Sequence, residues 1–112
     1  MQALWTMARE RLNVTVIVLA NREYAILKHE YVRMAAATMG DRARSMLSLG
    51  DPDIQFARLA EGFGVQAVRA IDTRELARAL EHALANDGPM LIEACMPPHE
   101  PTGLVLPSQL SL

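Results

Sequence analysis

Asn21 is the residue best placed to do chemistry, because it follows an apolar run at residues 14–19. This run is rich in Val and Ile and far shorter than a membrane span, which is typical of a buried strand in a parallel sheet. Beyond Asn21 the apolar residues recur with a helical period. Open α/β sheets bind ligands where a strand ends and a helix begins. The pattern therefore indicates a ligand-binding residue, although an Asn that only shapes a turn is the commoner meaning of this spacing.

Two oxygen atoms near this strand end could hold a metal ion. The carboxamide oxygen of Asn21 and the main-chain carbonyl oxygen of Glu23 are hard donors that suit magnesium (Mg²⁺) bound to phosphate oxygens. The positive end of the following helix would face the same phosphates. The residues therefore predict a metal–diphosphate site, but one that lacks a carboxylate ligand.

The other chemistry-bearing residues do not form a second site. The three histidines (His29, His82 and His99) fall in different segments, without the spacing of a zinc site. The sequence has no Gly-x-Gly-x-x-Gly loop, Walker loop or nucleophile elbow. Glu93 lies in an apolar run, where a structural carboxylate is the expected role. Cys95 in the same run is expected to be a small buried core residue.

Composition limits the class of protein and its partners. The chain has 112 residues, is 51% hydrophobic and 21% charged, and carries a net charge of −2, which suits one compact domain. No basic stripe is present to bind nucleic acid, and no apolar run approaches the ~20 residues of a membrane helix. No secretory signal opens the sequence, and a single cysteine fits a reducing compartment, so we expect a cytoplasmic protein.

Apolar spacing and turn residues predict seven helices and strands. They are a helix at 1–12, a strand at 14–19, a helix from 22 to about 37, a helix from 52 to 62 or 64, a strand at 65–71, a helix at 73–85 and a strand at 90–96. Strands that alternate with helices of this length predict an α/β fold with a parallel sheet covered on both faces.

The ends of these segments carry more specific signals. The first helix has no capping residue ahead of it. Residues 41–50 are expected to form a loop with at most a short helical turn. Asp51 is expected to cap the next helix, with Pro52 in its first turn. Asp72 and Glu75 have the spacing of a capping box. The Pro-rich residues 97–112 predict an extended tail, whose apolar residues 104–106 could dock on this domain or on a partner.

Several segments, in this order and spacing, resemble the C-terminal domain of thiamine diphosphate-dependent enzymes of the acetolactate synthase and benzoylformate decarboxylase type. The resemblance covers residues 1–96 and leaves the tail unmatched. It implies part of a doubly wound parallel-sheet cofactor-binding domain, with three strands and helices on both faces. The segments are Gln2-Ala3-Leu4-Trp5-Thr6 with Ala8-Arg9-Glu10, Asn21 with Tyr24-Ala25-Ile26-Leu27, residues 52–65 from Pro-Asp-Ile to Phe-Gly-Val, and Gly88-Pro89-Met90-Leu91-Ile92-Glu93.

The resemblance assigns roles to the residues around Asn21. In the family a metal-binding motif opens with Gly-Asp-Gly and closes with two Asn residues. It implies that Asn21 is the closing Asn and a Mg²⁺ ligand, with the main-chain oxygen of Glu23 as another. The first Asn of the pair is Ala20 here, a departure from the family pattern.

The residues after Glu23 are implied to meet the cofactor and the substrate. Tyr24 and Ala25 would approach thiamine diphosphate, while Ile26 and Leu27 would border the pocket where a 2-oxo acid reacts. The activity implied is that of a 2-oxo acid carboligase or decarboxylase, and such enzymes are homo-oligomers with active sites between subunits.

The Asp of the family's Gly-Asp-Gly would lie ahead of Met1, since only twenty residues precede Asn21. The Glu that activates the cofactor belongs to a separate domain in that family. We therefore expect a C-terminal fragment, or a gene prediction that starts at an internal Met, that is inactive by itself. The alternatives are a catalytically inactive module that associates with a partner subunit and a generic flavodoxin-like or nucleotide-binding domain.

Overall fold

The computed structural model describes residues 1–35 and 39–97, so the tail expected from residue 97 lies outside the described residues apart from its first position. Five helices and three strands are present in this part of the chain. In chain order they are α1 (Gln2–Arg9), β1 (Thr15–Ala20), α2 (Ala25–Ala35), α3 (Asp41–Leu47), α4 (Phe56–Gly62), β2 (Gln66–Ala70), α5 (Thr73–Ala85) and β3 (Met90–Cys95).

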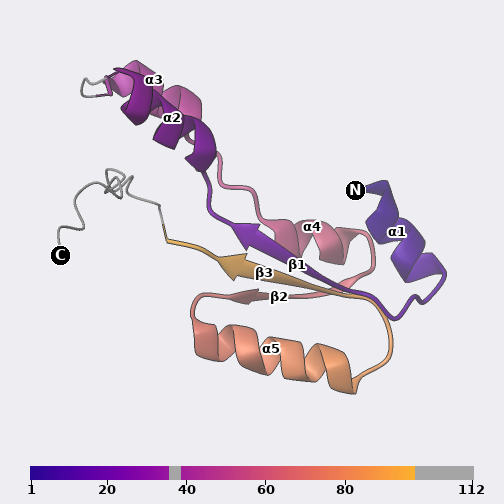
Figure 1. The fold of residues 1–112 in the computed structure, drawn as a ribbon. Helices are drawn as coiled ribbons and strands as arrows, with labels where there is room; N and C mark the ends of the chain where they lie inside the picture. The colour runs from indigo at the N-terminus through magenta and orange to yellow at the C-terminus, as the bar shows by residue number, and fades with distance from the viewer. Residues whose placement is uncertain (36–38, 98–112) are drawn as a thin grey trace, which may run out of the picture.

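The three strands form one parallel sheet in the order β1-β3-β2 (Figure 1). Thr15 pairs with Met90 and Ala20 with Cys95, so β1 and β3 end at the same level. On the other side of β3, Ala70 of β2 pairs with Ala94. The prediction of an α/β fold with three parallel strands is therefore confirmed.

Helices lie on both faces of the sheet, as the alternation of elements predicts. In Figure 1, α1 and α4 lie on one face and α5 on the other, while α2 and α3 project beyond the end of β1. Each face has its own apolar cluster. The cluster on the α4 face joins buried Ala60, Val65 and Leu91 to half-buried Val16 and Val18. The cluster on the α5 face has five buried residues and three half-buried ones, which are Ala70, Ala79, Ala83, Met90 and Ile92, and Val68, Leu76 and Leu80.

Strand β1 is less buried than its apolar sequence predicts. Val16 and Val18 pack on the α4 face, but Ile17 is 43% exposed and Leu19 is 64% exposed. The reason is the strand order: α5 packs on β2 and β3 and leaves the same face of β1 uncovered. The fully buried parallel strand is instead β3, the central one.

Two predicted segments differ from the structure. Residues 41–50, expected to be a loop, contain the helix α3, in which Asp41 lies favourably in the first turn. The next helix begins at Phe56, so the prediction that Asp51 caps it is wrong. The segment before it is drawn instead toward the end of β1, where Asp53 pairs with Arg22.

Helix α1 has no side-chain cap, as predicted, but it ends at Arg9 rather than at residue 12. Arg11 there has a φ of 49°, a left-handed conformation that interrupts the helix. No helix among the described residues is both long and apolar enough to cross a bilayer.

Helix α5 begins with the capping interaction that the sequence predicts. The Glu75 amide donates to Asp72 Oδ1 at 2.7 Å, and Glu75 Oε2 accepts from the Ile71 amide at 2.9 Å. The Glu75 carboxylate therefore bonds one residue ahead of the usual capping-box partner. The first bond satisfies an amide that the helix itself leaves unpaired, and the second ties the preceding residue to the first turn.

We expect Asp72→Ala to lower the free energy of unfolding by about 1 kcal/mol, because the Glu75 amide loses its acceptor. Urea denaturation measures this change. The control is Glu81→Ala, an exposed position later in the same helix. A loss for Asp72→Ala no larger than for Glu81→Ala would contradict the capping role.

Candidate functional site

The chain turns sharply at the carboxyl end of β1, where the sequence places its candidate ligand. Asn21 Oδ1 accepts a hydrogen bond from the Glu23 amide at 3.4 Å, and Arg22 between them has a left-handed φ of 57°. Asn21 thus shapes the turn, which is the common role for this spacing. An amide oxygen has two lone pairs, so this long hydrogen bond leaves acceptor capacity for a further ligand.

The segment between α3 and α4 holds this turn from the other side. The Leu49 amide donates to the Arg22 carbonyl at 2.7 Å, and the Tyr24 amide donates to the Leu47 carbonyl at 2.9 Å. Two segments far apart in the sequence therefore form one short antiparallel bridge, and this bridge fixes the entry into α2.

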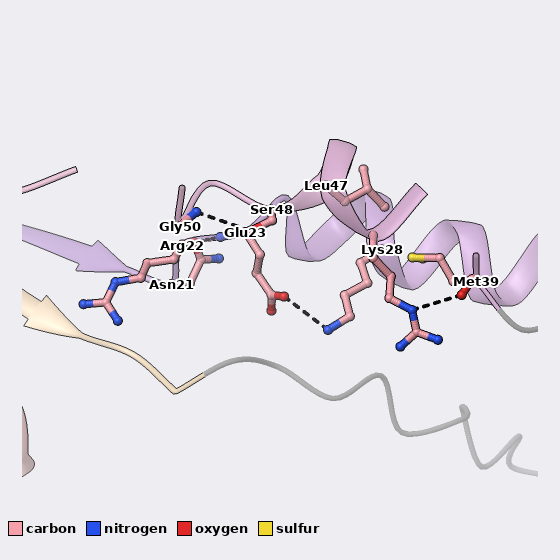
Figure 2. A pocket seen from close by; sticks show the side chains of 9 residues that line it. Asn21, Arg22, Glu23, Lys28, Met39, Leu47, Ser48 and Gly50 are labelled. Carbon is pink, nitrogen blue, oxygen red and sulfur yellow. Dashed lines mark hydrogen bonds and ion pairs between the residues drawn. The ribbon is translucent and has the colours of Figure 1, made fainter. Parts of the chain in front are cut away.

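A cavity of about 300 Å³ lies beside the turn, between the end of β1 and the α2–α3 pair (Figure 2). Lys28 Nζ lies 3.2 Å from Glu23 Oε2, in a pair whose side chains are 23% and 11% exposed. Arg44 Nε donates to the Met39 carbonyl at 3.0 Å. The residues that line the cavity are Asn21, Arg22, Glu23, Lys28, Met39, Arg44, Leu47, Ser48 and Gly50.

The charges of this lining favour an anionic ligand. Three cationic side chains and one carboxylate line the cavity. Since Lys28 offsets Glu23 and Asp53 offsets Arg22, the lining keeps the positive charge of Arg44, which attracts phosphate or carboxylate groups. Sequence reasoning did not find Lys28 and Arg44; Lys28 lies one residue after the matched segment, and Arg44 lies in the helix that was expected to be a loop.

The predicted site residues divide into two groups. Asn21 and Glu23 line the cavity together, at the place where the strand ends. Tyr24, Ile26 and Leu27 are exposed and do not line it, and Ala25 is half-buried at the start of α2. The roles of these four residues toward a cofactor or substrate stay predictions.

Glu93 has the structural role expected of it. It is 2% exposed, and its Oε2 accepts from the Ala57 amide in the first turn of α4 at 2.9 Å. No side chain of its own caps α4, so the buried carboxylate of β3 caps it from the sheet.

Cys95 is not the buried core residue that the sequence predicts. Lying at the last position of β3, it is half-buried, and its Sγ accepts from Arg69 Nε at 2.9 Å. Burial in the central strand is lost only at this last residue, where the strand reaches the carboxyl edge of the sheet.

The oxygen donors of the turn suit Mg²⁺ in kind but are too few to surround it. Asn21 Oδ1 and the main-chain oxygen of Glu23 are hard donors of the type that Mg²⁺ prefers. Within residues 1–35 and 39–97, no group of three or more His, Cys, Asp or Glu residues could hold a metal ion. His29 and His82 lie in separate helices, and His99 is outside these residues.

The parallel sheet, the turn at its carboxyl edge and the anion-attracting cavity define an α/β ligand-binding domain, and comparison with known proteins identifies the family. Residues 1–94 match the family described as "Thiamine pyrophosphate enzyme, C-terminal TPP binding domain". The chain belongs to this family, as the resemblance in its sequence implies.

Individual relatives agree with the family. The chain is 40% identical over 95 residues to the Mycobacterium tuberculosis protein named as acetolactate synthase large subunit IlvX, covering 84% of this chain and 18% of that protein. It is 37% identical over 91 residues to benzoylformate decarboxylase of Pseudomonas aeruginosa, covering 81% and 16%.

A solved structure has the same fold. The thiamine diphosphate-dependent 4-hydroxybenzoylformate decarboxylase of Rhodococcus jostii superposes with a TM-score of 0.72 at 29% identity, covering 89% of this chain and 18% of that one. The chain thus spans less than a fifth of the length of each of these three proteins.

We expect Asn21→Ala to lower the free energy of unfolding by only about 0.5 kcal/mol in metal-free buffer, because the hydrogen bond it removes is long and half-exposed. Asn21→Asp, which keeps the acceptor, serves as the control and should match the unsubstituted chain. Urea denaturation checks both values. A loss above about 2 kcal/mol for Asn21→Ala would make the turn, rather than a ligand, the main reason for this Asn.

Proposed function

We propose that this chain forms the C-terminal part of a thiamine diphosphate- and Mg²⁺-dependent 2-oxo acid carboligase or decarboxylase. Membership of the family supports thiamine diphosphate as the cofactor. The observation that carries the Mg²⁺ assignment is the turn at the end of β1, which places Asn21 Oδ1 and Glu23 on the wall of one cavity. The positive charge of the lining supports instead the anionic diphosphate that would accompany the metal.

In this proposal the residues of the turn bind and orient the cofactor. Asn21 Oδ1 and the main-chain oxygen of Glu23 hold Mg²⁺, and Tyr24 and Ala25 approach the cofactor from the start of α2. When bound, thiamine diphosphate supplies the chemistry of 2-oxo acid decarboxylation and carboligation. The positive charge of Arg44, which remains after Lys28 pairs with Glu23, favours the entry of anionic groups.

The substrate class rests on the relatives. An acetolactate synthase subunit and two decarboxylases of aryl 2-oxo acids are among them, which supports a 2-oxo acid as the substrate. Ile26 and Leu27, exposed apolar residues of α2, would border the reacting group. We place the protein in the cytoplasm, because its one cysteine forms no internal disulfide.

The second candidate is a catalytically inactive module that associates with a partner subunit. It is favoured by one observation: no cluster of carboxylates joins Asn21 and Glu23 among the described residues. Metal binding distinguishes the two candidates, because the first predicts that the Asn21 turn binds a metal ion and the second does not.

We expect Mn²⁺, added with thiamine diphosphate as a paramagnetic substitute for Mg²⁺, to broaden the amide signals of Asn21 and Glu23 before others. NMR spectra of the 112-residue chain during titration measure this. With only two donors in the turn, we expect binding weaker than micromolar, and no turnover of a 2-oxo acid.

The matched variants are Asn21→Ala, which should abolish the selective broadening, and Asn86→Ala, which should not. Asn86 follows α5 at the opposite end of the sheet. Broadening that is centred elsewhere, or that Asn21→Ala leaves unchanged, would contradict the proposed metal site. Micromolar binding of the metal and cofactor would contradict the expectation that two donors alone bind them weakly.

We also propose that the protein self-associates through the uncovered face of β1. Ile17 and Leu19 expose apolar surface on an edge strand, and such surfaces favour association. Leu19→Ser should therefore shift the chain toward the monomer in sedimentation velocity measurements.

The control for Leu19→Ser is Leu84→Ser, because Leu84 is 75% exposed but lies on α5, away from β1. This control should leave the distribution of species unchanged. A chain that is monomeric before substitution, or an equal effect of both variants, would contradict association through β1.

A further inference from the structure

Four charged side chains of alternating sign lie across the carboxyl ends of all three strands. Arg22 follows β1, Arg69 lies in β2, and Glu93 lies in β3. The fourth, Asp53, comes from the segment that precedes α4 and lines a small cavity of about 70 Å³ together with Asn21 and Arg22. The turn that carries Asn21 therefore touches one end of this set of charges.

The first pair joins the turn to the segment before α4. Arg22 Nε lies 2.7 Å from Asp53 Oδ1. Figure 2 shows the Arg22 side chain directed away from Glu23 and Lys28, back toward the strand ends. Arg22 Nε and Nη2 are both shielded from solvent and make no directed hydrogen bond to the described part of the chain. The charge of this guanidinium therefore depends on the Asp53 carboxylate for compensation.

The second pair joins β2 to β3. Arg69 Nε lies 3.7 Å from Glu93 Oε1, while the other Glu93 oxygen accepts from the Ala57 amide at 2.9 Å. The pKa of Arg69 is raised above its ordinary value, first by the hydrogen bond and charge of Cys95, and then by the charges of Glu93 and Asp53, against an opposing effect of desolvation. The chain itself joins the two pairs, because Glu93 holds the Ala57 amide only four residues after Asp53, which pairs with Arg22. The four charges therefore form one network.

The network holds the main chain of Arg22, which has a strained conformation. Arg22 has a φ of 57°, a left-handed conformation that is strained for a residue other than glycine. Asp53 belongs to the same segment as Leu49, whose amide donates to the Arg22 carbonyl. Side chain and main chain of Arg22 are therefore both held by the 49–53 segment, and Glu93 fixes the start of α4 directly after it.

We infer that this network is the device that positions the Asn21–Glu23 turn, and that Asp53 and Glu93 are positioning residues for it. Glu93 anchors the α4 start to the central strand, Asp53 carries that position to Arg22, and Arg22 sets the direction of Asn21 Oδ1. The functional consequence rests on the proposed role of the turn as a metal site, but the mechanical coupling does not.

The test is amide hydrogen exchange, measured by NMR on the 112-residue chain without metal or cofactor. Asp53→Asn should speed the exchange of the Leu49 and Tyr24 amides, which bridge the turn, by about tenfold through local opening. The Val65 amide, bonded to the Ala60 carbonyl in the α4 layer, should change less than about twofold. Asp53→Glu, which restores the charge, should restore most of the protection.

Two further variants complete the design. Glu93→Gln weakens the anchor, because it offers the Ala57 amide a neutral acceptor in place of a carboxylate, and it removes the charge beside Arg69; it should speed the same two amides. Asp51→Asn is the matched control, since Asp51 is an exposed carboxylate two residues from Asp53. If Glu93→Gln does not fold, Asp53→Asn still decides the question.

Unchanged rates at Leu49 and Tyr24 in Asp53→Asn would overturn the inference, as would an equal rise at Val65, which indicates a loss of global stability. An equal effect of Asp51→Asn would also overturn it. Because the exchange is measured without metal, its result does not depend on the Mn²⁺ titration. The network can position the turn even if the turn binds no metal, and the turn can bind metal even if the network does not position it.

Discussion

The parallel pairing of β1 and β2 with the central strand β3 is the constraint on which the rest of the structure depends. β3 is buried on both faces, and its register with β1 sets Ala20 opposite Cys95. All three carboxyl ends therefore meet at one edge, which brings Asn21, Arg69 and Glu93 to the same region of the molecule. Residues that are distant in the sequence therefore lie close together around a single site.

One buried carboxylate, Glu93, links the central strand to its neighbours at that edge. A buried charge is costly unless it is hydrogen-bonded or paired, and Glu93 has both kinds of partner in the α4 amide and Arg69. The same interactions that lower this cost also connect β3 to α4. The metal-binding turn, in our proposal, is thus supported by the core of the sheet rather than by its own short loop, which suits a site that must hold its ligands in fixed geometry.

Sequence patterns predict the features that depend on neighbouring residues. The apolar runs locate three strands, the Asp72 and Glu75 spacing locates a helix start, and the position of Asn21 after a strand locates the candidate site. Features that depend on distant residues were missed. The exposure of Leu19 follows from the strand order, which no single strand specifies. The start of α4 depends on the pairing of Asp53 with Arg22, since it is this pairing that draws the preceding segment away from a helix.

The central claim of our proposal is that the metal of the cofactor binds at the Asn21–Glu23 turn, and anomalous diffraction tests that claim most directly. The measurement is an anomalous difference map of crystals of the chain grown with thiamine diphosphate and Mn²⁺. We predict one strong peak within coordination distance of Asn21 Oδ1 and the Glu23 carbonyl oxygen, at the mouth of the cationic cavity. A metal peak bound elsewhere on the chain, with no peak at this turn, would contradict the account.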